Sequence, residues 1–395
     1  MRPTGEGEAL RAVHRRLLLI GAVAACVGGA AAFPVLASDD SAAVKVTAAT
    51  GKPVPGQYIV TLKAGASPDA TAKNVKAAGV RRFDGVLNGF AARLTGDQLG
   101  KLRHDSRVAA IEQDQVISIN TTQKAPLSWG LDRIDQRSRT LSKSYTYKST
   151  GSGVNAYVID TGLDVTHPNF GGRASIAWWA SSFSDGVDCN GHGTHVAGTI
   201  GSKTYGVAKN VNLRALRVLD CDGYGYMSDI VAAANWLRGH AVKPAVANLS
   251  VGGPSSAAVN TAVANLAKSG VFVTVAAGND NKDACKFSPS GASWVMTVGA
   301  TTVYDNRADF SNWGKCVDIN APGYSIPSTW PGGGTKSLSG TSMAAPHVSG
   351  VAALYLSTHK TATFAQVQKW LNDNSTHSLK RLKQQANRLV YKSSL

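Results

Sequence analysis

Hydrophobic and polar positions follow two different patterns along the chain, and each pattern predicts its own kind of domain. In residues 57–119, short apolar runs at 58–62, 90–94, 108–112 and 116–119 predict strands. Helices are expected over 67–78 and after the capping box that Thr95 and Gln98 form. Strands that alternate with helices over so short a span predict a small α+β domain of split βαβ, ferredoxin-like type.

From Trp129 onward, nearly continuous apolar runs alternate with amphipathic stretches. Helices are expected over 228–237 and 256–268 and from the capping box of Thr363 and Gln366, and strands over 154–159, 211–218, 245–250, 271–276 and 294–298. Strands that are apolar on both faces predict a parallel sheet buried between helices. The second domain is therefore expected to be a three-layer α/β domain with a mostly parallel central sheet.

The N-terminus has the layout of an export signal. Arginines at 11, 15 and 16 precede an apolar run over 17–33, and Val35-Leu36-Ala37 offers a small-residue cleavage site. We expect a secretory signal over 1–37, removed after Ala37. A membrane anchor, a lipoprotein box at Cys26 and twin-arginine export remain open alternatives, although no second apolar run of membrane length follows.

Composition adds size, charge and redox compartment to this picture. The chain has 395 residues, 43% of them hydrophobic, which is enough for more than one core, and a formal net charge of +16. No nucleic-acid motif accompanies the basic residues, so a solvated basic surface is expected. Removal of the signal would leave Cys189, Cys221, Cys285 and Cys316. An even number in an exported chain predicts two disulfides, and sequence alone allows three pairings.

Four polar residues stand at the ends of apolar elements. Asp160 and Asn279 each end or follow a predicted strand, whereas His192 and Ser342 each precede an apolar run of helical spacing. In open α/β sheets the functional crevice lies beyond the carboxyl ends of the strands, so we expect all four on one rim. A serine needs a base, a histidine is a suitable base near neutral pH, and a carboxylate fixes its tautomer. A side-chain amide can stabilise an oxyanion.

Each of these residues has an ordinary alternative interpretation. Ser342 is equally well explained as a helix cap, and Asp160 and Asn279 as turn residues. His192 and His195, three residues apart, could share a zinc ion, although no acidic third ligand stands nearby. The joint occurrence of all four residues is what favours acyl transfer.

The motifs around these residues resemble those of the subtilisin-like serine proteases. They are Asp160-Thr161-Gly162, His192-Gly193-Thr194-His195, Asn279 after Ala277-Gly278, and 340–346, Gly-Thr-Ser-Met-Ala-Ala-Pro. The order Asp, His, Ser is also that of the family. The detail is most similar to the proteinase K branch and its aqualysin-type enzymes, over Trp129 to the end, and residues 57–119 resemble the family's inhibitory propeptide.

The resemblance implies a role for each matching position. Asp160, His192 and Ser342 would form the catalytic triad, with Asn279 in the oxyanion hole. The pattern also implies the pairs Cys189–Cys221 and Cys285–Cys316. Two segments would clamp an extended peptide as added strands, and the second of them would line a shallow apolar pocket of broad preference. Their residues are Gly223, Tyr224, Gly225, Leu249, Ser250, Val251 and Gly252, joined in the pocket by Ala276 and Gly278.

Structural calcium is also implied. Asp318 matches a calcium carboxylate of the family, beside the backbone carbonyls of Ser293 and Val295. Asp132, Asp135 and Gln136 resemble part of a second calcium site. Oxygen ligands of this kind suit calcium, whereas ordinary surface charge is the alternative for these acids.

Together these inferences predict a secreted, monomeric serine endopeptidase made as a self-processing zymogen. Signal, propeptide and catalytic domain are expected over 1–37, 38–120 and 121–395, with self-cleavage near 120–122. Polypeptides would be its substrates, its own propeptide would act as chaperone and inhibitor, and neither nucleic acid nor a stable membrane anchor is expected. An inactive binding protein on the same scaffold is one alternative. An esterase is another, disfavoured because Ser342 lacks a G-x-S-x-G elbow.

Overall fold

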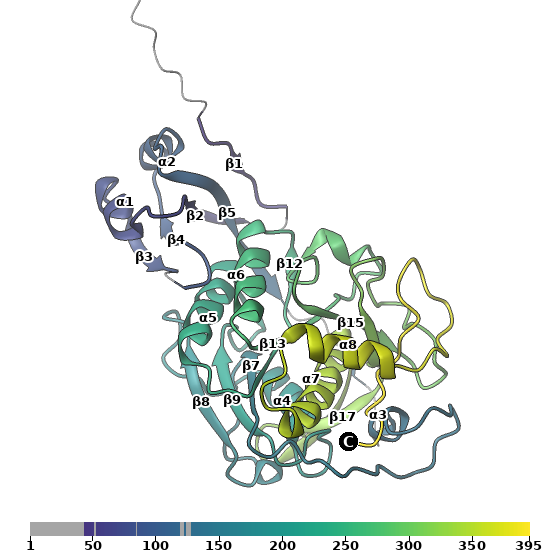
Figure 1. The fold of residues 1–395 in the computed structure, drawn as a ribbon. Coiled ribbons are helices and arrows are strands. Elements are labelled where there is room, and N and C mark those ends of the chain that lie inside the picture. The colour runs from purple at the N-terminus through teal and green to yellow at the C-terminus, as the bar shows by residue number, and fades with distance from the viewer. Residues whose placement is uncertain (1–42, 51–52, 84, 119–121, 124–127) are drawn as a thin grey trace, which may run out of the picture. The chain divides into compact units, whose positions relative to one another are not determined.

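The computed structural model describes residues 43–50, 53–83, 85–118, 122–123 and 128–395, so the predicted export signal lies outside the described residues. In the described part no helix has the length and apolar character needed to cross a membrane. Figure 1 gives the element labels used below.

The N-terminal domain is a β-sheet with two helices. Its elements are β1 (Val46–Thr47), β2 (Pro53–Leu62), α1 (Pro68–Asn74), β3 (Ala78–Arg82), β4 (Gly89–Arg93), α2 (Gly96–Arg103) and β5 (Val108–Ser118). The strand order β5-β2-β4-β3 is antiparallel throughout, and the capping box of Thr95 and Gln98 opens α2 as predicted. Two expectations were wrong. The run at 108–112 and the described part of the run at 116–119, which ends at Ser118, belong to one strand, and β3, which has few apolar residues, was missed.

The larger domain is built on a seven-stranded sheet of order β16-β15-β13-β11-β7-β9-β8, counted within the described residues. Every neighbouring pair in it is parallel. The strands are β7 (Asn155–Asp160), β8 (Ala174–Trp179), β9 (Asn212–Arg217), β11 (Ala245–Leu249), β13 (Phe272–Ala276), β15 (Met296–Thr301) and β16 (Ile319–Pro322). All residues of β7, β11 and β13 are buried, as their continuous apolar pattern requires.

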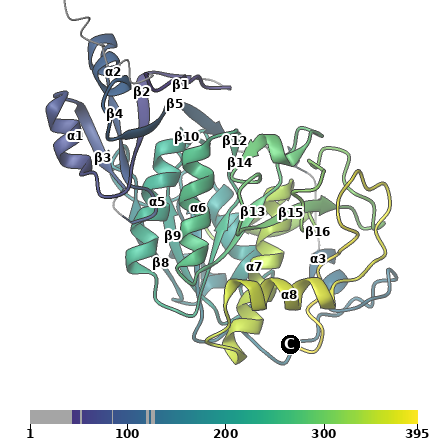
Figure 2. The ribbon, with the colours of Figure 1, turned by 45° about the horizontal axis from the view of Figure 1, so that its top comes forward.

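Helices cover both faces of this sheet. On one face α4 (His192–Gly201) packs against α7 (Thr341–Thr358), and on the other α5 (Met227–His240) packs against α6 (Ala257–Lys268) (Figures 1 and 2). The last helix, α8 (Phe364–Asn374), opens with the predicted capping box of Thr363 and Gln366. The sequence-derived fold class is thus confirmed, and the carboxyl ends of the strands share one edge.

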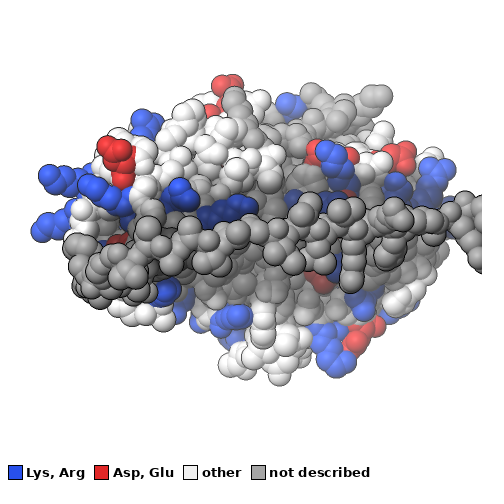
Figure 3. Space-filling view, turned by 90° about the horizontal axis from the view of Figure 1, so that it is seen from above, with Lys and Arg blue, Asp and Glu red and all other residues white. Residues whose placement is uncertain are grey.

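Short elements complete this domain around the sheet. They are β6 (Thr122–Gln123), α3 (Trp129–Ile134), η1 (Pro168–Phe170), β10 (Tyr224–Tyr226), β12 (Gly253–Pro254), η2 (Ala284–Lys286), β14 (Phe287–Ser288), β17 (Ile326–Trp330) and β18 (Gly334–Ser339). The C-terminal segment continues the sheet edge through a bridge between Asn320 and Leu389, and Leu389 is fully buried. The chain after α8 is therefore part of the core. Lys and Arg side chains occur across the face seen in Figure 3, which fits a solvated basic surface.

Candidate active site

The predicted acid and base form a buried hydrogen-bonded pair. Asp160 ends β7 and His192 opens α4, and Nδ1 of His192 lies 2.7 Å from Oδ1 of Asp160, with both side chains at most 1% exposed. Asp160 Oδ1 also accepts a bond from the backbone N–H of Thr161 at 2.8 Å. Because Nδ1 faces the carboxylate, Nε2 lies on the opposite side of the ring, and it makes no hydrogen bond to any described residue.

Ser342 is the second residue of α7, and Gly340 is the N-cap. The Ser342 hydroxyl makes no capping bond but donates to the carbonyl of Ser250 at 3.0 Å, so the helix-cap alternative does not describe it. Ser250 Oγ in turn donates to the Ser342 carbonyl at 2.9 Å. The hydrogen bond expected between Ser342 and His192 is not formed among the described residues. In unliganded sites such bonds are often long and tighten only with substrate.

Asn279 follows β13 and is oriented by Thr341. Its Oδ1 accepts bonds from the backbone N–H and the hydroxyl of Thr341, at 2.8 and 2.9 Å. The same hydroxyl accepts a bond from the Gly278 N–H at 3.0 Å. The amide oxygen is therefore committed to Thr341, and the NH₂ end of Asn279 points away from that residue.

A cavity of about 210 Å³ joins Ser342 and Asn279. The predicted residues Ser250, Val251, Gly252, Ala276 and Gly278 line it. The antiparallel pairing of β12 with β14 brings another part of the wall to the cavity, and its residues were not predicted from the sequence. No signal in the sequence pointed to that pairing. The missed lining residues are Gly253, Pro254, Phe287, Ser288 and Ser290.

The first predicted clamp segment lies on β10 and does not line this cavity. Gly223 precedes the strand, and Tyr224 and Gly225 lie in it. The edge of β10 pairs antiparallel with β5, with Tyr224 opposite Ser118 and Gly225 opposite Ile117. Leu249 ends β11, beside the cavity residues 250–252, and is fully buried. The edge of β10, where a peptide was expected to bind, is thus already paired with β5 of the same chain.

Both disulfides that the resemblance implied are present. Cys189 pairs with Cys221 and Cys285 with Cys316, with Cα–Cα distances of 4.9 and 5.3 Å. The first bond ties the approach to His192 to the turn before β10. It therefore links two parts of the site that are 32 residues apart in sequence.

His195 bonds to other residues than His192 does. Its Nε2 lies 3.0 Å from the carbonyls of Ile326 and Lys336, and burial, followed by the neighbouring His192, lowers its pKa from 6.5 to about 3. The two histidines therefore do not share a partner in this structure. His195 packs α4 against the hairpin of β17 and β18.

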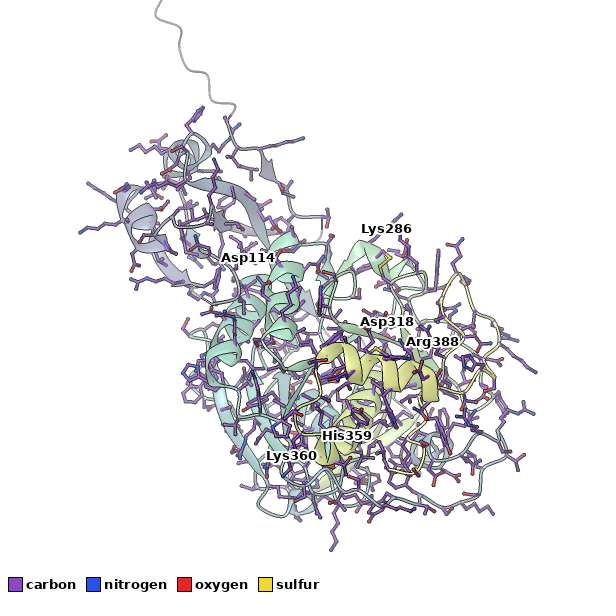
Figure 4. The ribbon with its side chains drawn as sticks, viewed as in Figure 1. Asp114, Lys286, Asp318, His359, Lys360 and Arg388 are labelled. Atoms are coloured by element: carbon purple, nitrogen blue, oxygen red, sulfur yellow. A yellow bond between two sulfur atoms is a disulfide. The ribbon has the colours of Figure 1, made fainter. Side chains whose placement is uncertain are left out.

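The two sets of residues expected to hold calcium differ in how well their oxygen atoms would suit a hard cation. Asp318 is half-buried, burial raises its pKa to about 6, and it lies beside Arg388 (Figure 4). Its Oδ2 accepts a bond from the Thr297 N–H at 2.8 Å. The predicted carbonyls belong to Ser293 and Val295, on either side of Trp294, which has a φ of +59°. A cation would offset the cost of partly burying this carboxylate, so the Asp318 side chain suits a calcium ligand, and the role of the two carbonyls remains a prediction.

The second predicted set is engaged differently. Both carboxylate oxygens of Asp132 accept bonds from residues 142 and 143, and Asp135 Oδ2 accepts one from Thr146. Gln136 donates its amide to the carbonyls of Ser138 and Thr140. Asp135 Oδ1 is buried without a hydrogen bond in the described part, and it is the one group there that would suit a cation. The second calcium site remains a prediction.

Comparison with known proteins agrees with this geometry. The subtilase family model matches residues 151–390, and the peptidase inhibitor I9 model matches residues 57–120. The chain is 52% identical to the extracellular serine proteinase of Thermus sp. strain Rt41A over 72% of this chain and 70% of that protein. It is 48% identical to the alkaline serine protease ver112 of Corniculantispora psalliotae over 84% and 87%.

A solved structure shows the same fold. A cold-adapted subtilisin-like serine proteinase aligns with a TM-score of 0.66 and 48% identity, over 67% of this chain and 97% of the other. The family model alone spans more than half of the chain. This protein therefore belongs to the subtilase family of serine endopeptidases, with an I9 inhibitor domain ahead of its catalytic domain.

Proposed function

We propose that Asp160, His192 and Ser342 are the catalytic triad of this endopeptidase and that Asn279 stabilises the oxyanion. The observation that carries the proposal is the buried 2.7 Å contact between His192 Nδ1 and Asp160 Oδ1. This contact fixes the tautomer that presents Nε2 as a base and stabilises the imidazolium that forms. Ser342 and Asn279, which line one cavity, supply the nucleophile and the donor.

In this proposal, the Ser342 hydroxyl rotates from the Ser250 carbonyl toward His192 and attacks the carbonyl carbon of a peptide bond. His192 Nε2 takes the hydroxyl proton and then gives it to the leaving amine, which departs as the acyl-enzyme forms. Water attacks the ester carbonyl with His192 again as base, the bond from the acyl carbon to Ser342 Oγ breaks as His192 returns the proton to Oγ, and the carboxylic acid is released. The Asn279 NH₂ and the Ser342 backbone N–H hold the negative oxygen of both tetrahedral intermediates.

The substrate is expected to bind as an added strand. The edge of β10 already pairs with β5, at Ser118 opposite Tyr224, and β18 pairs with β6, at Thr122 opposite Ser339. Ser339 is only three residues before Ser342. The chain on either side of residues 119–121 is therefore paired to β10 on one side and, on the other, to β18, which leads directly to Ser342. This supports self-cleavage within that stretch and the predicted boundary near residue 120.

Two further features support the remaining parts of the proposal. The pocket walls at Gly252, Ala276 and Gly278 are small, which favours a broad preference for apolar side chains. The relatives include an extracellular serine proteinase, which supports export of this chain through its N-terminal signal. We include calcium at Asp318, with the carbonyls of Ser293 and Val295, as a structural ion that stabilises the fold.

The test is expression of the full chain with Ser342→Ala in a host that lacks other extracellular proteases. We expect the variant to remain uncleaved, whereas the wild-type chain is shortened near residue 120. Ser357→Ala, near the end of the same helix, is the matched control and should be processed normally. Appearance of the short form in the Ser342→Ala protein, read by mass and N-terminal sequencing, would refute self-processing.

A further inference from the structure

Asp188 is a second buried carboxylate close to the proposed acid and base, and the catalytic scheme above does not use it. Asp188 is 4% exposed, and its carboxylate accepts five hydrogen bonds from described residues. All five donors are neutral, and no described cationic side chain pairs with it. A carboxylate offers about four lone-pair sites, so this acceptor is saturated.

Four of these five donors belong to residues just before or just after His192 in the sequence. Before it, the N–H groups of Asn190 and Gly191 donate to Asp188 Oδ1 at 3.1 and 2.7 Å. After it, the N–H and the hydroxyl of Thr194 donate to Oδ2 at 2.8 and 2.6 Å. Asp188 therefore fixes the backbone on both sides of His192, in the first turn of α4, where a negative charge is also favoured by the helix dipole.

The fifth donor belongs to the segment that carries Asp160. The Thr161 hydroxyl donates to Asp188 Oδ1 at 2.8 Å and accepts a bond from the Gly193 N–H at 2.9 Å. The Thr161 backbone N–H donates to Asp160 Oδ1 at 2.8 Å, the same oxygen that faces His192. One hydroxyl thus connects the loop after β7 with the start of α4.

The two segments touch backbone to backbone at this point. A Cβ atom on Gly193 would lie 2.2 Å from the Gly162 carbonyl oxygen, so only glycine permits the approach. This close approach fixes the relative position of the two segments only if hydrogen bonds hold them together. The hydrogen bonds of Thr161 and Asp188 are fully buried and supply that connection.

We propose that Asp188 is a positioning residue, which acts through Thr161 and the backbone around His192 to hold the Asp160 carboxylate against the His192 ring. The inference rests on the proposed roles of Asp160, His192 and Ser342. A helix cap alone would need one acceptor for the α4 N–H groups, and a neutral serine or asparagine supplies it. A helix cap for α4 does not require the additional hydrogen bond that the Thr161 hydroxyl donates to Asp188.

The test compares Thr161→Val, Thr161→Ser and Asp188→Asn in the mature enzyme. Thr161→Val keeps the side-chain shape and removes the bridging hydroxyl. We expect kcat to fall about tenfold to 10²-fold with KM nearly unchanged, because small misplacements of catalytic groups cost this much. Thr161→Ser should restore kcat, and Asp188→Asn should lower it at least as much as Thr161→Val. The double variant should lose less than the product of the two single losses, because both act on one connection.

Thr199→Val is the matched control, since Thr199 is equally buried on the same helix and its hydroxyl donates, within the described residues, to the His195 carbonyl of its own helix. The second readout is the rate at which a small fluorophosphonate labels Ser342, because this probe does not use the peptide cleft. We expect it to fall with kcat in Thr161→Val and to stay at the wild-type rate in Thr199→Val.

Three outcomes would overturn the proposal: labelling at the wild-type rate in Thr161→Val and Asp188→Asn, a loss confined to KM, or an equal loss in Thr199→Val. If Asp188→Asn does not fold, the two Thr161 variants still decide the question. Failure of the wild-type enzyme to be labelled at Ser342 would instead refute the proposed function.

Discussion

Asn279 illustrates how single residues are aimed in this site. Thr341 precedes the proposed nucleophile and holds the amide oxygen of Asn279 with two hydrogen bonds. The orientation of the amide is therefore set by the residue next to Ser342. The sequence identified Asn279 from its place after an apolar strand, but it contained no sign of the bond to Thr341.

We predict that Asn279→Leu lowers kcat by about 10²–10³ with little change in KM, because the lost donor serves the transition state rather than the bound substrate. That magnitude is the one known for the corresponding donor in subtilisin, a member of this family, and is adopted here. Steady-state kinetics on a peptide substrate provides the measurement. Asn281→Asp, in the same loop, is the control because Asp tolerates the φ of +52° at this position, and an equal loss there would contradict the assignment.

Buried histidines make stability depend on pH. Burial lowers the pKa of His347 from 6.5 to about 4, and that of His195 to about 3. The folded protein takes up these protons less readily than the unfolded chain does. The free energy of unfolding is therefore at its full value above about pH 6.5 and falls as the pH drops toward 4. Each group contributes at most about 1.4 kcal/mol per pH unit.

We predict that His347→Gln reduces this acid sensitivity. Urea unfolding of the Ser342→Ala chain, which cannot digest itself under the proposed function, should show a smaller stability loss between pH 7 and pH 5 when His347 is replaced. His104→Gln, at an exposed histidine, is the control and should leave the pH dependence unchanged. An unchanged pH slope in the His347 variant would show that another group governs the acid loss.

Elements place these residues through their ends. Asp160 ends β7 and Asn279 follows β13, whereas His192 and Ser342 open α4 and α7. Because all seven strands are parallel, their carboxyl ends share one edge, and apolar periodicity was enough to predict this. Periodicity could not reveal β3, which has few apolar residues, nor the pairing of β12 with β14, which depends on contacts far apart in sequence.

The strand β15 and the loop before it also set the expected calcium response. Asp318 is a half-buried carboxylate beside this strand, so bound calcium should stabilise the folded state, by about 2.7 kcal/mol at a concentration a hundred times Kd. We predict that chelation lowers Tm of the wild-type protein. Asp318→Asn should lower Tm in the presence of calcium and abolish most of the response to chelation. The exposed Asp309→Asn variant should keep that response, and its loss there would argue against Asp318 as a ligand.

At the scale of the whole molecule, the two domains are joined by polar contacts as well as by the pairing of β5 with β10. Glu112 accepts bonds from Ser256 Oγ and the Ala258 N–H, both at 2.7 Å, where α6 begins. Arg81 forms an ion pair with Asp229, whose side chain is fully buried, and donates to Ser228 Oγ at 2.8 Å. Residues of the inhibitor domain thus form hydrogen bonds and an ion pair with polar groups at the starts of α5 and α6.

We predict that Arg81→Ala weakens inhibition by the cleaved N-terminal domain. Only Asp229 is fully buried in this pair, and removal of Arg81 leaves that carboxylate without its counter-charge, at a cost of at most about 3–5 kcal/mol. The variant chain should therefore show a shorter lag between self-cleavage and full peptidase activity. Lys73→Ala, an exposed change on α1, is the control. Equal lags in the two variants would exclude a role for the ion pair in inhibition.

The sequence by itself determined the fold class, the two-domain order, the cysteines and the four polar residues of the proposed site, because these depend on local periodicity and short motifs. Tertiary structure decided what depends on distant contacts: the rotation of the Ser342 hydroxyl toward Ser250, the hold of Thr341 on Asn279 and the β12–β14 wall of the cavity. It also decided the burial of Asp188 between two segments that carry catalytic candidates. Hydrogen bonds between residues far apart in sequence arise only when the sheet brings strand ends together, so no local pattern encodes them.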